Sequence, residues 1–190
     1  MRFAAIDVET ANADLSSICQ VGVAFFEDGA HTKSWSTLVD PEDEFDDFNV
    51  SIHGIDEQTV KGAPKWPAVI AELRALLSGN VAACHTPFDR AATTLACEKY
   101  RLEQIDCRWL DTARVVRRAW PEKFAATGYG LRHVAKFLGI DFKHHDALED
   151  ARAAGEVLAE RDEAGARVDD ETAFAPVHRG PGHDHPVACA

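Results

Sequence analysis

The chain has 190 residues and a formal net charge of −12, which suits one domain with a substantial core. This negative charge argues against a protein that coats nucleic acid by charge alone. It does not argue against an enzyme that binds one strand end through metal ions. No apolar run approaches the length of a membrane span, and the N-terminus lacks a signal pattern. Five scattered cysteines without a Cys-x-x-Cys pair predict reduced thiols and a cytoplasmic location.

The first part of the chain predicts three strands. Residues 2–6 are a short apolar run, 18–26 a longer one, and 35–39 alternate between apolar and polar residues. Asp28-Gly29 is a hairpin signal, so the second and third strands are expected to pair antiparallel beside the first. Residues 41–49 are acidic and irregular, which predicts a loop.

The rest of the chain alternates between helices and short strands. A helix is expected after Pro67, stopping at 78–80, and is followed by a strand at 81–84 and a helix begun by Thr86 and Pro87. A strand at 107–110 and a helix from 112 to about 120 come next. Two further helices are expected, one ending at Gly139 and the last running to about 161. Apolar periodicity fails after that point. The sequence therefore predicts a folded domain at 1–161 and a disordered tail or linker at 162–190.

Asp7 and Glu9 follow the first predicted strand and are two residues apart, so they are expected to share one face. Two neighbouring carboxylates repel each other, and a hard cation such as Mg²⁺ would relieve that repulsion. An acidic pair at a strand end is also typical of a solvated turn. The metal interpretation therefore depends on further carboxylates downstream.

Three downstream residues could complete such a site. Asp89 lies in the first turn of a predicted helix, at the edge of the sheet where open α/β proteins place their sites; it could instead serve only the helix dipole. His145 and Asp150 flank the start of the last helix, where Asp146 and Glu149 resemble a capping box. Taken singly, His145 and Asp150 could both be ordinary surface residues.

Taken together, these motifs resemble the DEDDh, or DnaQ-like, 3′–5′ exonucleases, which include the polymerase III proofreading subunit, RNase T and oligoribonuclease. The likeness covers roughly residues 2–158, and it is carried by Asp7-x-Glu9-Thr10, His85-Thr86-Pro87-Phe88-Asp89 and His145-x-Ala147-x-x-Asp150, with a softer match at Ile52-His53-Gly54-Ile55. The second motif departs from the family pattern, because Thr86 and a shorter spacing replace the usual Asn. The resemblance implies a ribonuclease H-like α/β fold, in which a five-stranded mixed sheet has helices on both faces.

The resemblance also implies a role for each site residue. Two divalent cations, Mg²⁺ or Mn²⁺, would be held by Asp7, Glu9, Asp89 and Asp150, with Asp7 bridging them. His145 would be the general base, since its ordinary pKa of about 6.5 suits that task near neutral pH. Thr10 and Phe88 are expected to contact the 3′-terminal nucleotide. The expected reaction releases 5′-mononucleotides from the 3′ end of single-stranded DNA or RNA.

Two other functions remain open at this point. A catalytically silent nucleic-acid-binding module of the same fold would keep the architecture without turnover, and an endonuclease of the same fold would cut internally. The choice between DNA and RNA is also open, because no reader of the 2′-hydroxyl is evident. A DNA polymerase, or another replication or repair protein, is a candidate partner, and the oligomeric state is undetermined.

Overall fold

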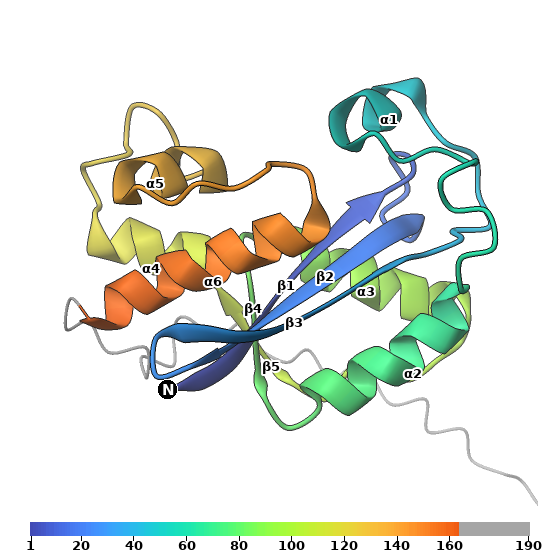
Figure 1. Ribbon diagram of the computed structural model, residues 1–190, viewed down its shortest axis with the longest axis horizontal. Helices are drawn as coiled ribbons and strands as arrows, with labels where there is room; N and C mark the ends of the chain where they lie inside the picture. Colours follow the sequence, from blue (N-terminus) through green and yellow to red (C-terminus); the bar gives the residue numbers. More distant parts are fainter. Residues whose placement is uncertain (164–190) are drawn as a thin grey trace, which may run out of the picture.

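The computed structural model describes residues 1–163, with side chains described through residue 160. The predicted tail at 162–190 lies almost wholly outside the described residues, so its disorder stays a prediction. The elements are β1 Arg2–Thr10, β2 Ile18–Glu27, β3 Ala30–Leu38, α1 Asp47–His53, α2 Trp66–Leu77, β4 Val81–Cys84, α3 Phe88–Lys99, β5 Arg108–Asp111, α4 Thr112–Ala119, α5 Leu131–Leu138 and α6 Ala147–Glu163 (Figure 1). None of the helices described here is both long and apolar enough to cross a membrane.

The five strands form one mixed sheet in the order β3-β2-β1-β4-β5. β1 pairs antiparallel with β2 and parallel with β4, and β5 extends the parallel part. Helices α2 and α3 lie on one side of the sheet, and α4, α5 and α6 lie on the other (Figure 1). The predicted α/β class, with a five-stranded mixed sheet between helices, is therefore confirmed.

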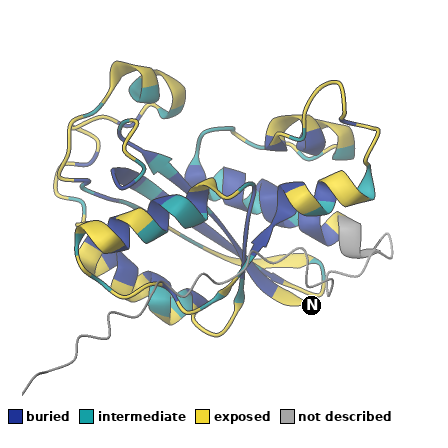
Figure 2. Ribbon diagram, turned by 180° about the vertical axis from the view of Figure 1, so that it is seen from behind, coloured by how far each residue is buried: buried dark blue, intermediate teal, exposed yellow. Residues whose placement is uncertain are grey.

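β1 separates two hydrophobic layers because its side chains alternate between the faces of the sheet. Ala4, Ile6 and Val8 pack with α2 and α3, whereas Phe3 and Ala5 pack beneath α6. Figure 2 shows the buried residues concentrated in the sheet and on the inner sides of the helices. The alternation places the residues that follow Phe3 and Ala5 on the α6 side of the sheet.

Gly22 allows the start of α6 to lie directly on the sheet. A Cβ atom at Gly22 would stand 2.3 Å from the carbonyl carbon and oxygen of Ala147 and from the Leu148 nitrogen. The Ala147 N–H also donates to the Gln20 side chain, at 3.1 Å. Because Gly22 pairs with Asp7 in the β1–β2 register, this close contact brings the first turn of α6 to the carboxyl end of β1.

Three local expectations were wrong. β3 is longer than residues 35–39, because its polar residues from Ala30 onward pair with β2 at the edge of the sheet. Helix α1 begins inside the expected loop, where the Asp46 side chain accepts the Phe48 N–H. Thr86 does not start α3: it has a positive φ of 91°, and Pro87 is the residue that precedes the first helical turn.

Candidate active site

The carboxyl end of β1 meets the first turn of α6 at a cluster of three acids. Asp7 and Glu9 project from the same face of β1 as Phe3 and Ala5, and that face is the one α6 covers. Asp150 lies in the first turn of α6. One carboxylate oxygen from each of Asp7, Glu9 and Asp150 lies within 4.8 Å of the other two.

Asp89 approaches Asp7 from α3. Its buried carboxylate accepts the Val8 N–H at 3.0 Å. β4 pairs with β1 only at Ala82 and Ala83, so this bond forms beyond the paired part of the parallel ladder. Asp89 is also the neighbouring charge that most strongly raises the pKa of Asp7. Asp89 therefore stands beside the cluster formed by Asp7, Glu9 and Asp150.

Burial and mutual repulsion hold protons on these acids in the metal-free protein. Burial raises the pKa of Asp7 well above its ordinary value, and the charges of Asp89, Asp150 and Glu9 raise it further. Burial, together with the charges of Asp150 and Asp89, raises the pKa of Glu9 to about 8. Burial raises the pKa of Asp89 to about 7, although the Val8 N–H lowers it. Such a set of crowded oxygen donors fits a hard divalent cation, which would replace the protons.

Asp150 also organises the turn that leads into α6. Its carboxylate accepts the backbone N–H groups of His145 at 2.6 Å and Asp146 at 3.2 Å, and lies 2.7 Å from His144 Nδ1. This arrangement replaces the expected capping box, since Asp146 lies 3.6 Å from Lys143 and Glu149 pairs with an arginine of its own helix. Asp150 is therefore structural as well as a candidate ligand.

His145 and His144 lie together, not on opposite sides of the chain. Their rings stack with centroids 3.9 Å apart, and His145 has a positive φ of 66°. Burial lowers the pKa of His145, and the neighbouring His144 lowers it further. His144 contacts both the candidate base and the carboxylate of Asp150.

An open cleft of about 490 Å³ contains the acid cluster. Its walls come from α1 on one side and from the start of α5 on the other, through Ile52 and Leu131 among others. Thr10 and Phe88 line it as well, and the Phe88 ring is 40 % exposed. All seven residues singled out from the sequence therefore border one cleft, namely Asp7, Glu9, Thr10, Phe88, Asp89, His145 and Asp150.

Two residues of α1 that border this cleft had no predicted role in the site. Asn49 Nδ2 donates to the Thr10 carbonyl at 2.9 Å, and His53 Nε2 lies 3.2 Å from the same oxygen. His53 Nδ1 accepts the Ile55 N–H at 3.0 Å, so the Nε2–H tautomer donates to Thr10. His53 belongs to the softer matching segment, which was the available signal. Nothing in the sequence marks Asn49.

His85 has a structural place behind the cleft. Its Nδ1 lies 2.8 Å from Thr112 Oγ1 and its Nε2 lies 2.8 Å from the Tyr129 carbonyl oxygen. Burial lowers the pKa of His85, which favours a neutral ring in these contacts. His85 therefore ties the end of β4 to the start of α4 and to the segment before α5.

Comparison with known proteins gives a consistent result. A family model described as exonuclease, of the RNase T type, matches residues 4–158. The 3′–5′ exonuclease DinG of Bacillus subtilis is 28 % identical over 164 residues, which cover 84 % of this chain and 17 % of that protein. A PolC-type DNA polymerase III of Streptococcus thermophilus is 27 % identical over 160 residues, which cover 82 % of this chain and 11 % of that protein. The chain thus spans less than a fifth of these relatives.

Solved structures share the fold. The nuclease domain of 3′hExo, a DEDDh family member bound to rAMP, superposes with a TM-score of 0.74 at 17 % identity, covering 86 % of this chain and 92 % of that one. Exonuclease X in complex with 5′-overhanging duplex DNA gives a TM-score of 0.71 at 20 % identity, covering 90 % and 97 %. The fold is therefore that of the ribonuclease H-like exonucleases, as the sequence predicted.

Proposed function

This chain belongs to the exonuclease family, with DEDDh 3′–5′ exonucleases as its structural neighbours, and on that premise we propose that it is a metal-dependent 3′–5′ exonuclease. The observation that carries the proposal is the cluster of Asp7, Glu9 and Asp150, with Asp89 beside it. These acids come from three separate elements and meet at one cleft. The pKa values of Asp7, Glu9 and Asp89 are raised, which is typical of a site built to bind cations.

The four acids have distinct roles in the proposed site. Two Mg²⁺ or Mn²⁺ ions would be held by these carboxylates, one by Asp7, Glu9 and Asp150 and the second by Asp7 and Asp89. When bound, such an ion pair stabilises the charge that develops on the attacking and leaving oxygens. Asp89 and Asp150 are buried and Asp7 and Glu9 are half-buried, which partly protects their charges from screening by bulk water.

His145 is the proposed general base. It borders the cleft within one turn of Asp150, and its lowered pKa keeps the ring neutral, and so able to accept a proton, at physiological pH. His145 would take a proton from the attacking water while the bond from phosphorus to the 3′ oxygen breaks. The leaving product is a 5′-mononucleotide, and the shortened strand keeps its 3′ hydroxyl.

Thr10 and Phe88 are the proposed contacts to the terminal nucleotide. Thr10 is fixed through its carbonyl by Asn49 and His53, and the partly exposed Phe88 ring offers an apolar face to a base or sugar. We propose single-stranded DNA or RNA as the substrate. The PolC-type relatives favour a polymerase, or another replication or repair protein, as a partner. Four of the five cysteines lie in the described part, all as free thiols, which favours the reducing cytoplasm.

A digestion panel tests the proposal. Single-stranded DNA, duplex DNA with mismatched ends and short RNA, each with a 3′ label, are incubated with Mg²⁺, with Mn²⁺ and with EDTA. We expect labelled 5′-mononucleotides to appear first, and only with a divalent cation. A circular single strand is the control for internal cutting, and its cleavage would support an endonuclease. A pure protein that binds strands but releases no nucleotide from any of them would support the silent binding module.

A further inference from the structure

The two walls of the cleft carry opposite charge. Residues 112–145, which include α4 and α5, contain seven lysines and arginines and only two acids. Residues 40–57, which include α1, contain eight acids and no lysine or arginine. This asymmetry stands out in a chain with a net charge of −12. Both segments contribute residues to the same cleft, through Asn49 and His53 on one wall and Gly130 and Leu131 on the other.

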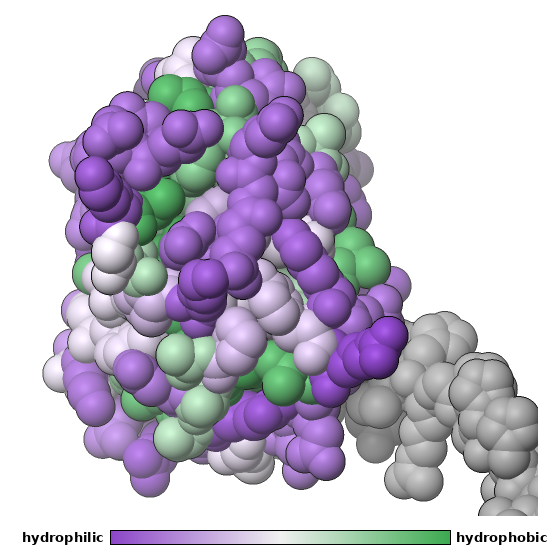
Figure 3. Space-filling model, turned by 90° about the vertical axis from the view of Figure 1, so that its right-hand side faces the viewer, coloured by the Kyte–Doolittle hydropathy of each residue, from purple (hydrophilic) through white to green (hydrophobic). Residues whose placement is uncertain are grey.

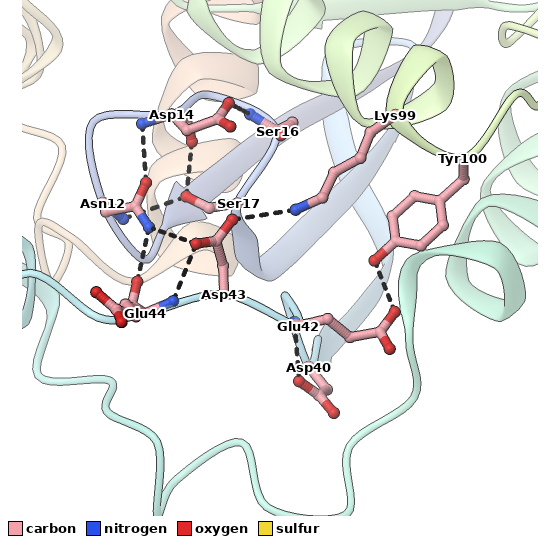
Figure 4. A network of polar contacts seen from close by, with 10 residues as sticks. All are labelled: Asn12, Asp14, Ser16, Ser17, Asp40, Glu42, Asp43, Glu44, Lys99 and Tyr100. Atoms are coloured by element: carbon pink, nitrogen blue, oxygen red, sulfur yellow. Dashed lines mark hydrogen bonds and ion pairs between the residues drawn. The ribbon is translucent and has the colours of Figure 1, made fainter.

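The acidic wall, formed by residues 40–57, is neutralised only in part. Glu42 pairs with Lys65. Glu42 also accepts the Tyr100 hydroxyl, and Asp43 lies 3.1 Å from Lys99 (Figure 4). These bonds hold the segment before α1 against α3, but Glu44, Asp46 and the acids of α1 and the turn after it add further negative charge. The side of the molecule that carries α2 and α3 is mostly hydrophilic (Figure 3). A phosphodiester chain would be repelled along this wall.

The basic wall, formed by residues 112–145, begins at the mouth of the cleft. Arg132 is exposed in the first turn of α5 and directly follows Leu131, which lines the cleft. The Arg117 guanidinium lies over the Tyr129 ring, 5.1 Å from its centroid, and Tyr129 directly precedes the Gly130 that lines the cleft. Positive charge therefore stands beside the catalytic residues on this side.

Away from the cleft, the basic wall continues over a cluster of aromatic side chains. Lys123 lies over the Phe137 ring, 4.5 Å from its centroid, and Phe137 packs against Trp120 and Phe124. Lys136, on the exposed side of α5, is one turn beyond Arg132. An aromatic ring orients a cation without neutralising its charge, so these side chains still attract phosphate.

We propose that the strand leading to the 3′ end leaves the cleft over α4 and α5, with its phosphates on Arg117, Lys123, Arg132 and Lys136. This inference rests on the proposed exonuclease function and adds a direction to it. The acid cluster holds the terminal nucleotide through cations, the acidic wall repels the rest of the strand, and the basic wall attracts it. The path also explains how a strongly acidic protein holds a polyanion.

Kinetics on substrates of two lengths test this path. The variant Arg117→Gln/Lys136→Gln and the control Lys33→Ala/Lys61→Ala each remove two exposed positive charges, the second pair lying away from the basic wall. We expect the first variant to lower, by about tenfold, the ratio of kcat/KM for a 20-nucleotide strand to kcat/KM for a dinucleotide. The slope of log kcat/KM for the long strand against log salt concentration should become shallower by about 1.4, because two phosphate contacts are lost and each contributes about 0.7. The control should leave the ratio as it is in the parent protein. Equal effects of the two variants would overturn the proposed path.

Cross-linking tests the path without any need for turnover. A 12-nucleotide strand carries a photoreactive azidophenacyl group on its third phosphorothioate from the 3′ end and is irradiated with the protein in Ca²⁺. We expect the cross-linked peptides to lie within residues 112–138. Cross-links within residues 40–57, or none on either wall, would refute the path. Parent protein that cross-links at 112–138 but digests nothing would instead refute the proposed function alone.

Discussion

At the scale of single residues, the site is a set of carboxylates with different additional roles. Asp7 and Glu9 have high pKa values because they are crowded and buried. Asp150 accepts two backbone N–H groups and contacts His144, so it also holds the turn before α6 in place. Removing one of these acids should therefore not have the same effect on stability as removing another.

Replacing Asp7 and Asp150 separates these roles. Asp7→Asn should abolish turnover, yet leave the melting temperature of the metal-free protein unchanged or higher, because it removes repulsion. Asp150→Ala should abolish turnover and also cost about 1–3 kcal/mol in the free energy of unfolding, since it leaves the N–H groups of His145 and Asp146 without their acceptor. Urea unfolding in EDTA measures both. An Asp7→Asn protein with normal activity at saturating Mg²⁺ would show that the metal assignment is wrong.

The stacked histidines need separate variants. His145→Ala should lower kcat by roughly 10²–10⁴-fold, the usual contribution of a positioned base, with little change in Mn²⁺ affinity. The parent rate should rise with pH around a midpoint below 6.5, because the pKa of His145 is lowered. His144→Ala should reduce kcat less, through Asp150 and the lost stacking. Turnover against pH and Mn²⁺ calorimetry are the measurements.

The control for these variants is His31→Ala, which alters an exposed histidine of the edge strand β3. It should match the parent protein in both measurements. If His145→Ala bound Mn²⁺ far more weakly, His145 would be a ligand instead of a base. If it kept the parent rate and pH midpoint, it would be a bystander.

At the scale of elements, the site depends on how closely α6 approaches β2. Asp150 reaches Asp7 and Glu9 only because the backbone at Ala147 lies against the bare Cα of Gly22. Farther along the same helix, a Cβ at Gly155 would stand 2.0 Å from the Phe26 ring. Two glycines, one on each element, therefore set the distance between the helix and the sheet.

Gly22→Ala should displace the start of α6. The new methyl would meet backbone atoms, which cannot rotate away as a flexible side chain can, so we expect a loss of about 1–3 kcal/mol in stability and a large loss of turnover. Thermal melting and the nuclease assay check this. Gly130→Ala is the control for stability, because its φ of −63° is ordinary and no atom lies within 4 Å of the added Cβ. An unchanged melting temperature for Gly22→Ala would contradict the close packing.

At the scale of the whole molecule, the net charge of −12 is distributed so that it serves the cleft. Acids concentrate in the proposed cation site and in the segment carrying α1, while the segment 112–145, which borders the same cleft through Gly130 and Leu131, is rich in basic residues. Crowded acids are a cost to the metal-free fold, because folding must bring like charges together. Divalent cations should remove that cost.

The stability of the whole domain should therefore depend on pH differently with and without metal. Glu9 and Asp89, with pKa values of about 8 and about 7, keep protons in the folded state that the unfolded chain loses near pH 4. The metal-free melting temperature should therefore fall as pH rises from about 5 to about 8. Saturating Mn²⁺ should raise it, and by more at pH 8 than at pH 6, because protons compete for the carboxylates. Calorimetric scans with Mn²⁺ or EDTA measure this; a metal effect independent of pH would contradict it.

The strands, most helices and the five proposed catalytic positions could be predicted from the sequence. Alternation along β1 was enough to place Asp7 and Glu9 on one face, because the period of a strand is fixed by its backbone. The resemblance of the motifs to the DEDDh exonucleases then pointed to Asp89, His145 and Asp150. These features could be predicted because each depends on residues near one another in the chain or on a pattern carried by the residues themselves.

Contacts between distant segments became visible only in the folded protein. The bonds from Asn49 and His53 to the Thr10 carbonyl, and the contact of Ala147 with Gly22, join segments whose relative placement no local pattern encodes. The same holds for the two charged walls. Their compositions are visible in the sequence, but packing around the sheet is what sets them on opposite sides of one cleft.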